Sequence, residues 1–166
     1  MAAGSVEAIF LHEGRTGGEP MTAVASARAV AAGGLEGDRF FQGPGSVAAK
    51  RGPDREVSLI EAEAIEAVGR EGKVALAAEQ SRRNIVTRGV ALNHLVDREF
   101  RVGGVLLRGI RLCEPCKHLE QLTQPGMLMA LLHRGGLRAQ VLEGGEVRVG
   151  DPVEILEPAV AGVAAR

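Results

Sequence analysis

The segment from Leu112 to His118 brings together more reactive side chains than any other part of the sequence. It reads Leu-Cys-Glu-Pro-Cys-Lys-His, so two thiols, a carboxylate, an amine and an imidazole fall within seven positions. Three kinds of site use such groups: a structural zinc site, a redox pair of cysteines, and a single working thiol that carries sulfur or binds a metal. The rest of the sequence distinguishes between them.

A structural zinc site needs four ligands, which usually come as two separated pairs. Cys113 and Cys116 form one pair, and the sequence has no further cysteine. Only scattered histidines remain to complete the set, and His118 is the nearest of them. We therefore expect no zinc, and a zinc-stabilised module through these three residues stays an alternative.

The two remaining interpretations differ in the role of Cys113. A redox C-x-x-C of the thioredoxin kind opens a helix after a strand, in a chain where strands and helices alternate, and this sequence lacks that alternation. A single working thiol fits better, because Pro115 has no N–H for a strand ladder and leaves Cys116 in a loop that a ligand can reach. Cys113 is then predicted to point into the core as a small apolar residue.

A working thiol needs cationic neighbours that favour its thiolate form. Lys117 and His118 directly follow Cys116 and are candidates for that role. The alternative, that both are ordinary solvated loop residues, is equally open at this point.

Arg82, Arg83 and Asn84 form a second candidate group, at the start of an apolar run. A guanidinium group is a planar fork of donors suited to phosphate, and an Asn amide both donates to and accepts from the edge of a heterocycle. The three residues therefore suit a phosphorylated pterin or a nucleotide. Judged by these residues alone, solvated arginines with an Asn in a turn are the preferred alternative.

Gly37, Asp38 and Arg39 form a third candidate group, in which Asp38 and Arg39 are expected to bind a cofactor; a turn whose Asp bonds its own backbone is the alternative. Phosphate-loop, dinucleotide-binding, nucleophile-elbow and zinc-protease motifs are all absent from the sequence. A nucleotide-binding α/β enzyme is therefore disfavoured.

The elements that must position these groups are predicted to be mostly strands. Short β-type runs, separated by Gly or Pro, recur along the chain. They are Val6–Leu11, Thr22–Val30, Arg55–Leu59, Asn84–Thr87, Phe100–Val102, Val105–Leu112, Leu137–Leu142 and Val153–Leu156. Such a series favours a mainly β (α+β) fold, a closed or partly closed barrel with a few short helices.

One helix is predicted over about Leu59–Val68. Ser58 and Glu61 have the spacing of a capping box, in which two side chains satisfy free amides at a helix start. Gly69 or Gly72 is placed to end this helix in the left-handed conformation.

A second helix is predicted over Met127–His133, where Met127 and Met129 are expected to fill the core rather than to bind a ligand. The stretch Gln42–Pro53 is rich in Gly, Pro and small residues and predicts a mobile loop.

Length and composition predict one globular domain over residues 1–156 and a flexible tail over 157–166. The net charge of −1, the absence of Trp and Tyr and the four Phe argue against a nucleic-acid partner. No apolar run approaches the roughly 20 residues that cross a bilayer, and no basic segment precedes the first apolar stretch. Two cysteines in a domain that needs no disulfide indicate a reducing compartment, so we expect a cytoplasmic protein without membrane contact.

Six blocks of sequence, taken in order, carry a family resemblance. They are Leu35-Glu36-Gly37-Asp38-Arg39, Val57-Ser58-Leu59-Ile60, Arg82-Arg83-Asn84-Ile85-Val86, Cys113-Glu114-Pro115-Cys116, Gly135-Gly136-Leu137-Arg138-Ala139 and Val149-Gly150-Asp151-Pro152-Val153. Together they resemble the MOSC family, named for the C-terminal domain of molybdenum cofactor sulfurases. The similarity spans about Val6 to Leu156, and the order and spacing of the blocks make it specific.

The resemblance implies a β-rich barrel whose family cysteine corresponds to Cys116. In the family this cysteine either carries sulfur as a persulfide or binds the molybdenum of the pterin cofactor. Arg82 and Asn84 correspond to the family's R-x-N motif near the pterin or its phosphate, and Arg83 takes the variable position between them.

The resemblance also implies two kinds of partner. Relatives that bind the cofactor reduce N-hydroxylated compounds with electrons from an electron-transfer protein, whereas the sulfurases fuse this domain to a pyridoxal-phosphate desulfurase. A stand-alone domain is therefore expected to be such a reductase, or a sulfur carrier supplied by a separate cysteine desulfurase. A small-ligand binding module with passive cysteines is the alternative from another class.

Overall fold

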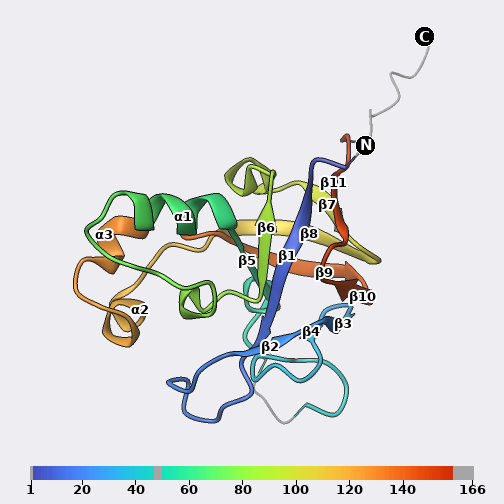
Figure 1. Ribbon diagram of the computed structural model, residues 1–166. Coiled ribbons are helices and arrows are strands. Elements are labelled where there is room, and N and C mark those ends of the chain that lie inside the picture. The colour runs from blue at the N-terminus through green and yellow to red at the C-terminus, as the bar shows by residue number, and fades with distance from the viewer. Residues whose placement is uncertain (1, 47–49, 159–166) are drawn as a thin grey trace.

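The computed structural model describes residues 2–46 and 50–158, and these residues form a mainly β structure (Figure 1). The strands are β1 (Gly4–Leu11), β2 (Thr22–Val24), β3 (Ser26–Val30), β4 (Gly34–Leu35), β5 (Val57–Glu61), β6 (Ile85–Arg88), β7 (Glu99–Val102), β8 (Val105–Leu112), β9 (Leu137–Glu143), β10 (Gly145–Arg148) and β11 (Pro152–Ile155). The helices are α1 (Ala62–Arg70), α2 (Lys117–Leu122) and α3 (Met127–Leu131), with 3₁₀ turns at Pro53–Arg55, Glu79–Ser81 and Leu92–Leu95.

Seven strands of the described chain close into a barrel, in the order β11-β7-β8-β9-β5-β6-β1. The first and last strands close it, because β1 pairs with β11 through Gly4 and Val153. Strand β2 adds to β1, and β10-β3-β4 form a small second sheet. The predicted mainly β barrel with a few short helices is therefore confirmed.

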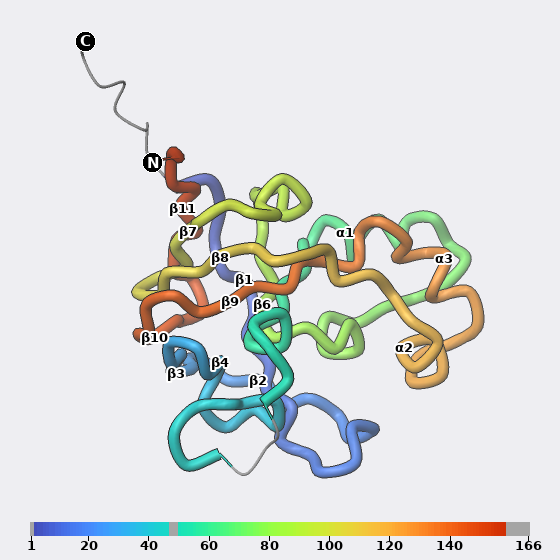
Figure 2. Tube along the Cα trace, turned by 180° about the vertical axis from the view of Figure 1, so that it is seen from behind, coloured from blue at the N-terminus to red at the C-terminus, as the bar shows by residue number. Residues whose placement is uncertain are grey.

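The apolar core has two parts, one inside the barrel and one between the barrel and the helices. Inside the barrel lie side chains such as Leu59, Phe100 and Leu137. Between barrel and helices lie Ile60 and Met127 among others, on the side where all three helices gather in both views (Figures 1 and 2). Strand β5 therefore buries both of its faces.

That double burial explains why the predicted start of the first helix is wrong. Ser58 and Glu61 belong to β5, which pairs with β9 on one side and with β6 on the other. Ser58 Oγ bonds to the Asn84 side chain instead of capping a helix. Helix α1 begins at Ala62, and Gly72 follows it with a φ of +72°, as expected for a helix terminator.

The other strand predictions hold with small shifts in their bounds. The run Thr22–Val30 divides into β2 and β3, which pair with different partners, β1 and β10. The short strands β4 and β10 were not predicted, because two and four residues with glycine carry little β-type pattern.

The helix predictions near the cysteines need two corrections. The segment after Pro115 was predicted as a loop, but Cys116 stands at the N-cap position of α2. Met127 is fully buried as expected, whereas Met129 is 70% exposed and does not fill the core. Helix α3 ends at Leu131 rather than at the predicted His133, and Met127 and Leu131 are its buried residues.

Part of the predicted mobile loop (47–49) and most of the predicted tail (159–166) lie outside the described residues. Among the residues described, no helix combines the length and the apolar character needed to cross a membrane.

Glu56, which precedes β5, is a buried carboxyl group. Its side chain is 4% exposed and accepts a hydrogen bond from the Val141 N–H, and burial raises its pKa to about 7. Between pH 4.5 and 7 the folded chain therefore binds more protons here than the unfolded chain, and stability falls as the pH rises through that window.

Glu56→Gln keeps an acceptor for the Val141 N–H and removes the titration. We expect the variant to be more stable than the parent by about 1–2 kcal/mol at pH 8 and equal to it at pH 4. Urea unfolding at both pH values measures the difference. An equal gain at pH 4 and pH 8 would contradict the cause assigned here.

Candidate functional site

One end of the barrel carries a cavity of about 280 Å³, to which loops, strands and helix α2 all contribute. Its polar lining residues are His12, Thr16, Arg39, Arg51, Arg55, Ser58, Arg82, Arg83, Asn84, Cys113, Cys116, His118 and Arg138. Six of them are arginines, and no Asp or Glu lines the cavity within the described chain. The cavity is therefore suited to an anionic ligand.

The two cysteines lie at this cavity in different environments. Strand β8 ends at Leu112, and Cys113 follows it with 1% of its surface exposed. Cys116 is exposed, and neither cysteine forms a disulfide. The predicted division into a buried and an accessible thiol is confirmed. Because α2 begins directly after Cys116, the motif does stand between a strand and a helix, the local arrangement assigned above to thioredoxin-like pairs.

Arg83 fixes the segment that carries the cysteines. It is 6% exposed and donates to three backbone carbonyls, those of Gly135 at 2.9 Å, Ser81 at 3.0 Å and Cys113 at 3.1 Å. All three of its nitrogens are thus used inside the protein. Arg83 lines the cavity, so its charge can still act on a ligand there. Its hydrogen bonds, however, join three segments of the chain to one another.

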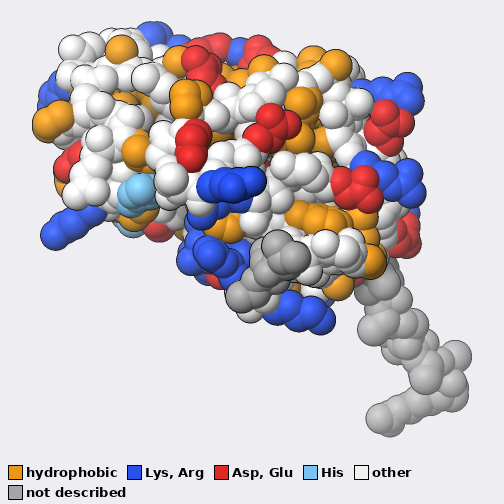
Figure 3. All heavy atoms as spheres, turned by 90° about the horizontal axis from the view of Figure 1, so that it is seen from below, with side chains coloured by type: hydrophobic (Ala, Val, Ile, Leu, Met, Phe, Trp, Pro, Cys, Tyr) orange, Lys and Arg blue, Asp and Glu red, His pale blue; other side chains and the backbone are white. Residues whose placement is uncertain are grey.

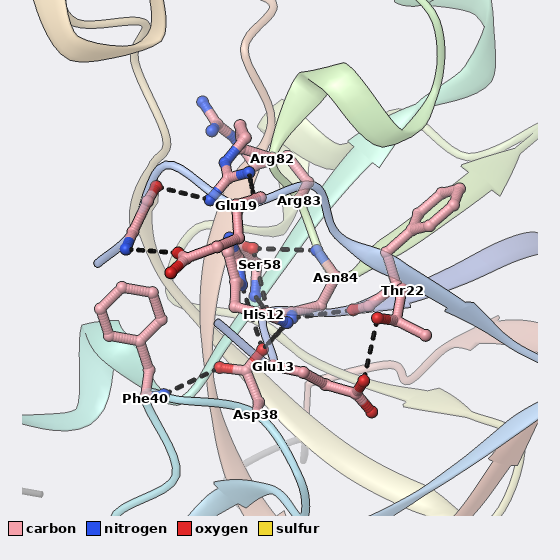
Figure 4. Close-up of polar contacts among 12 residues, drawn as sticks. His12, Glu13, Glu19, Thr22, Asp38, Phe40, Ser58, Arg82, Arg83 and Asn84 are labelled. Carbon is pink, nitrogen blue, oxygen red and sulfur yellow. Dashed lines mark hydrogen bonds and ion pairs between the residues drawn. The ribbon is translucent and has the colours of Figure 1, made fainter. Parts of the chain in front are cut away.

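Arg82 is also committed to the protein. Its two terminal nitrogens donate to the carbonyls of Glu19 and Gly17 (2.7 Å for the second), which holds the loop after β1 against the cavity (Figure 4). Arg82 adopts a left-handed φ of +63°, and its side chain lies beside Glu19 of that loop. Burial, and then the charge of Arg39, lowers the pKa of Arg82.

Asn84 lies in the cavity wall with every hydrogen-bonding position of its amide used. Its Nδ2 donates to the Phe10 carbonyl and to Asp38 Oδ1, both at 3.1 Å, and its Oδ1 accepts from the N–H and the Oγ of Ser58 (Figure 4). An Asn amide has two donors and two acceptor positions, so none is left over. Asn84 therefore joins β1, β5 and the Asp38 turn, and pairing with a heterocycle would have to displace one of these bonds.

The buried guanidinium nitrogens without any partner are not on Arg82 or Arg83. Arg39 Nη1 and Arg138 Nε are buried without a hydrogen-bond partner among the described residues. Arg55 makes no side-chain hydrogen bond within the described part of the chain, and its charge acts on Arg138. Burial lowers the pKa of Arg138, because its charged form lacks solvent. These three side chains are the best placed to receive an anion.

Phe40 adds an aromatic side chain to the same wall. The guanidinium carbons of Arg39 and Arg51 each lie 5.2 Å from its ring centroid. Gln42 accepts from the Arg51 N–H at 2.6 Å and so holds Arg51 near the cavity. Seen from below, Lys and Arg side chains gather near the middle of this end of the molecule (Figure 3).

The structure thus brings most of the predicted site residues together at one cavity. Cys116, Arg82, Arg83, Asn84, His118 and Arg39 all line it. Asp38 lies directly behind the wall and bonds to His12 and Asn84, and Lys117 is outside the lining. Arg51, Arg55, Arg138 and His12 were missed as site residues.

A signal for Arg138 was present in the sequence. Leu137 and Ala139, on either side of Arg138 in β9, are fully buried in the barrel. Successive side chains of a strand point to opposite faces, so Arg138 lies on the outer face, beside the segment that carries the cysteines. Arg51, Arg55 and His12 lie in loops or turns that only the barrel closure brings together, and no local pattern marks them.

No group of three or more His, Cys, Asp or Glu side chains placed to hold a metal ion occurs within residues 2–46 and 50–158. The absence of zinc remains a prediction.

The exposure difference between the thiols predicts their order of alkylation. In the native protein, iodoacetamide should label Cys116 at least about 100-fold faster than Cys113, because Cys113 reacts only when the structure opens. Mass spectrometry of peptides after timed quenching measures both rates. Labelling of the denatured chain, in which the two should react alike, is the control, and faster labelling of Cys113 in the native state would contradict the geometry.

Solved structures of low sequence identity share this fold. The YUAD protein from Bacillus subtilis is 18% identical with a TM-score of 0.74, and the alignment covers 92% of this chain and 94% of that one. YiiM from Geobacillus stearothermophilus is 18% identical with a TM-score of 0.70 (95% and 77% covered). YiiM from Escherichia coli is 19% identical with a TM-score of 0.66 (92% and 70% covered).

No curated protein sequence matches the chain. The model of the MOSC domain matches residues 47–154, a stretch that includes the cysteines, the Arg-Arg-Asn group, Arg55 and Arg138. The six blocks of sequence, the closed barrel and this match agree, and the chain belongs to the MOSC family.

Proposed function

We propose that the cavity binds a molybdenum-pterin cofactor, with Cys116 as the thiolate ligand of the metal and with arginines holding the phosphate. The observation that carries the proposal is the lining itself: six arginines and an accessible thiol share one cavity whose described lining has no carboxylate. Thiolate sulfur is a ligand type that soft metal centres take, and guanidinium groups bind phosphate in a fixed geometry.

The residues present fit such a cofactor. Buried guanidinium nitrogens without partners, on Arg39 and Arg138, are costly unless an acceptor reaches them. A phosphate oxygen is the acceptor that also offsets the accumulated positive charge. The cavity, at about 280 Å³, is just below the size range of small-molecule sites, roughly 300–1,000 Å³, and it is partly open to solvent.

Reduction of N-hydroxylated compounds is the activity we propose for the loaded protein. Conversion of N–OH to N–H and water consumes two electrons and two protons. The bound cofactor would supply the two-electron redox chemistry, and an electron-transfer protein would supply the electrons. The side chains of this chain would hold the cofactor, orient the substrate and handle the protons. The two free thiols suit a reducing compartment, and we propose the cytoplasm as the location.

A sulfur carrier is the second candidate, and the exposure of Cys116 favours it. A cysteine desulfurase that uses pyridoxal phosphate would load the thiol as a persulfide, and an acceptor protein would need only to reach that exposed sulfur. The carrier has no evident need for six arginines, which is why cofactor binding is preferred.

Elemental and pterin analysis of protein purified from a host that makes the cofactor tests the proposal. We expect stoichiometric molybdenum and pterin in the parent protein and in Cys113→Ala, and neither in Cys116→Ser. Persulfide on Cys116 without molybdenum would replace the proposal with the carrier. Neither modification nor cofactor in any sample would favour the passive binding module.

Arginine variants locate the phosphate in the same assay. Arg138→Met and Arg55→Met should lower the pterin content at least about tenfold, because each removes a charged donor from the anion site. Arg108→Met is the matched control, since Arg108 lies on the neighbouring strand β8 outside the cavity lining. Equal pterin content in all three would place the phosphate elsewhere.

A further inference from the structure

His12 is a second chemically competent side chain in the cavity wall. It directly follows β1, is 8% exposed and lines the same cavity as Cys116. Its Nδ1 lies 3.0 Å from Asp38 Oδ1, and its ring meets the edge of Phe40 in a T-shaped contact (Figure 4). The ring is therefore held in one orientation by two different neighbours.

The surroundings of Asp38 decide which nitrogen of His12 carries the proton. Oδ1 accepts from the His12 backbone N–H at 2.7 Å and from Asn84 Nδ2 at 3.1 Å, and Oδ2 accepts from the Phe40 N–H at 3.0 Å. An ionised carboxylate accepts hydrogen bonds and has none to donate. The hydrogen in the His12–Asp38 contact must therefore sit on Nδ1, and in the neutral ring Nε2 keeps its lone pair.

Nε2 has no hydrogen-bond partner among the described residues, although the ring is nearly buried. His12 thus lines the cavity with Nδ1–H held by a buried carboxylate and with Nε2 free within the described chain, an arrangement that serves general acid–base catalysis.

We propose that His12, oriented by Asp38, is the catalytic acid of this cavity, an assignment that rests on the proposed reduction of N-hydroxylated compounds. In that reaction the N–O bond breaks, and two electrons arrive from the reductant. The protonated ring gives the proton on Nε2 to the departing oxygen, which leaves as water. The second proton reaches the substrate nitrogen from solvent, and solvent also returns the ring to its protonated state.

Other side chains of the described lining are less suited to this role. The arginines keep their protons at neutral pH. Cys116 is assigned to the metal, and Cys113 is buried with its carbonyl held by Arg83. His118 is exposed on α2 and makes no hydrogen bond within the described chain that would orient its ring.

The tautomer of His12 is testable without cofactor or activity. In ¹⁵N-labelled, cofactor-free protein at pH 8, long-range ¹H–¹⁵N correlation spectra should show a protonated Nδ1 and an unprotonated Nε2 for His12. His12→Asn identifies the signal by its loss. A protonated Nε2 in the neutral ring would overturn the assignment, because Nδ1 would then carry no hydrogen for Asp38 and the orientation of the ring argued here would be lost.

Turnover of the loaded protein tests the catalytic role. His12→Asn places an amide N–H where Nδ1–H stands, so it keeps the bond to Asp38 and removes Nε2. With N-hydroxyguanidine as substrate and reduced methyl viologen as electron donor, we expect kcat to fall by about 10²–10⁴-fold at unchanged molybdenum and pterin content. His94→Asn, at an exposed position outside the cavity, is the matched control.

The outcomes separate this inference from the proposed function. Full cofactor content with an undiminished kcat in His12→Asn, or a loss in His118→Asn in its place, would overturn the role of His12 alone. A parent protein that holds no cofactor, or that holds it without reducing the substrate, would overturn the proposed function and the acid role together.

Discussion

Arg83→Met is expected to lower the free energy of unfolding by about 3–5 kcal/mol. The guanidinium donates to three carbonyls, so its removal leaves the oxygens of Ser81, Cys113 and Gly135 without their donor in a buried region. Each such loss costs about 1–3 kcal/mol, and methionine fills the space without replacing any of the bonds. For a chain of this size the midpoint of thermal unfolding should fall by roughly 6–20 °C.

Arg82→Met is the matched comparison for that variant. Arg82 is only half-buried and holds two carbonyls of one loop, so we expect a loss of about 1–2 kcal/mol. Urea unfolding of both variants at one pH gives the two values. If Arg82→Met lowers the free energy of unfolding as much as Arg83→Met, the burial of Arg83 does not explain how strongly its hydrogen bonds stabilise the fold.

Gly136→Ala is expected to cost at least about 3 kcal/mol. Gly136 has a φ of +111°, and a Cβ there would come within 1.9 Å of the Leu59 carbonyl oxygen in the middle of β5. Strand β9 would have to move away from β5 to admit it. The Gly136 carbonyl also accepts from the Cys113 N–H at 2.7 Å, so the same movement would loosen the cysteine segment.

Gly150→Ala is the control that separates the two costs in Gly136→Ala, the strain of a positive φ and the clash of the new Cβ with Leu59. Gly150 has a φ of +93°, but a Cβ there meets nothing within 4 Å, so only the strain of about 1 kcal/mol should appear. Thermal and urea unfolding of both variants should differ by about 2 kcal/mol or more. Equal losses would mean that the β5–β9 contact relaxes freely. In Gly136→Ala we also expect faster alkylation of Cys113 than in the parent.

The strands that alternate clearly were predictable from the sequence, and those whose role depends on other strands were not. Strand β8 was predicted with the bounds it has, because its apolar residues and flanking glycines define it locally. Strand β5 was partly assigned to a helix, because an apolar run buried on both faces has no period of its own. The capping-box spacing of Ser58 and Glu61 was therefore accidental, because both residues lie in a strand.

The residues of the candidate site were largely predictable from the sequence, but the contacts that each side chain makes were not. Pro115 and the cysteine spacing correctly predicted one accessible thiol and one buried thiol. The chemistry of Arg82, Arg83 and Asn84 suits a ligand, but backbone carbonyls and side chains of distant segments already use their donors. Which polar group is left unpaired depends on the whole tertiary structure, and a local pattern carries no record of it.

The β1–β11 seam has a consequence for synthesis on the ribosome. Of the barrel strands β1 is made first and its partner β11 (Pro152–Ile155) last, so the barrel cannot close until β11 has left the ribosome. Until then the Gly4–Ser5 part of β1 and one edge of β7 lack their partner, and such edges recruit other chains. A stalled nascent chain that ends before Pro152 should therefore depend on chaperones more strongly than the released protein.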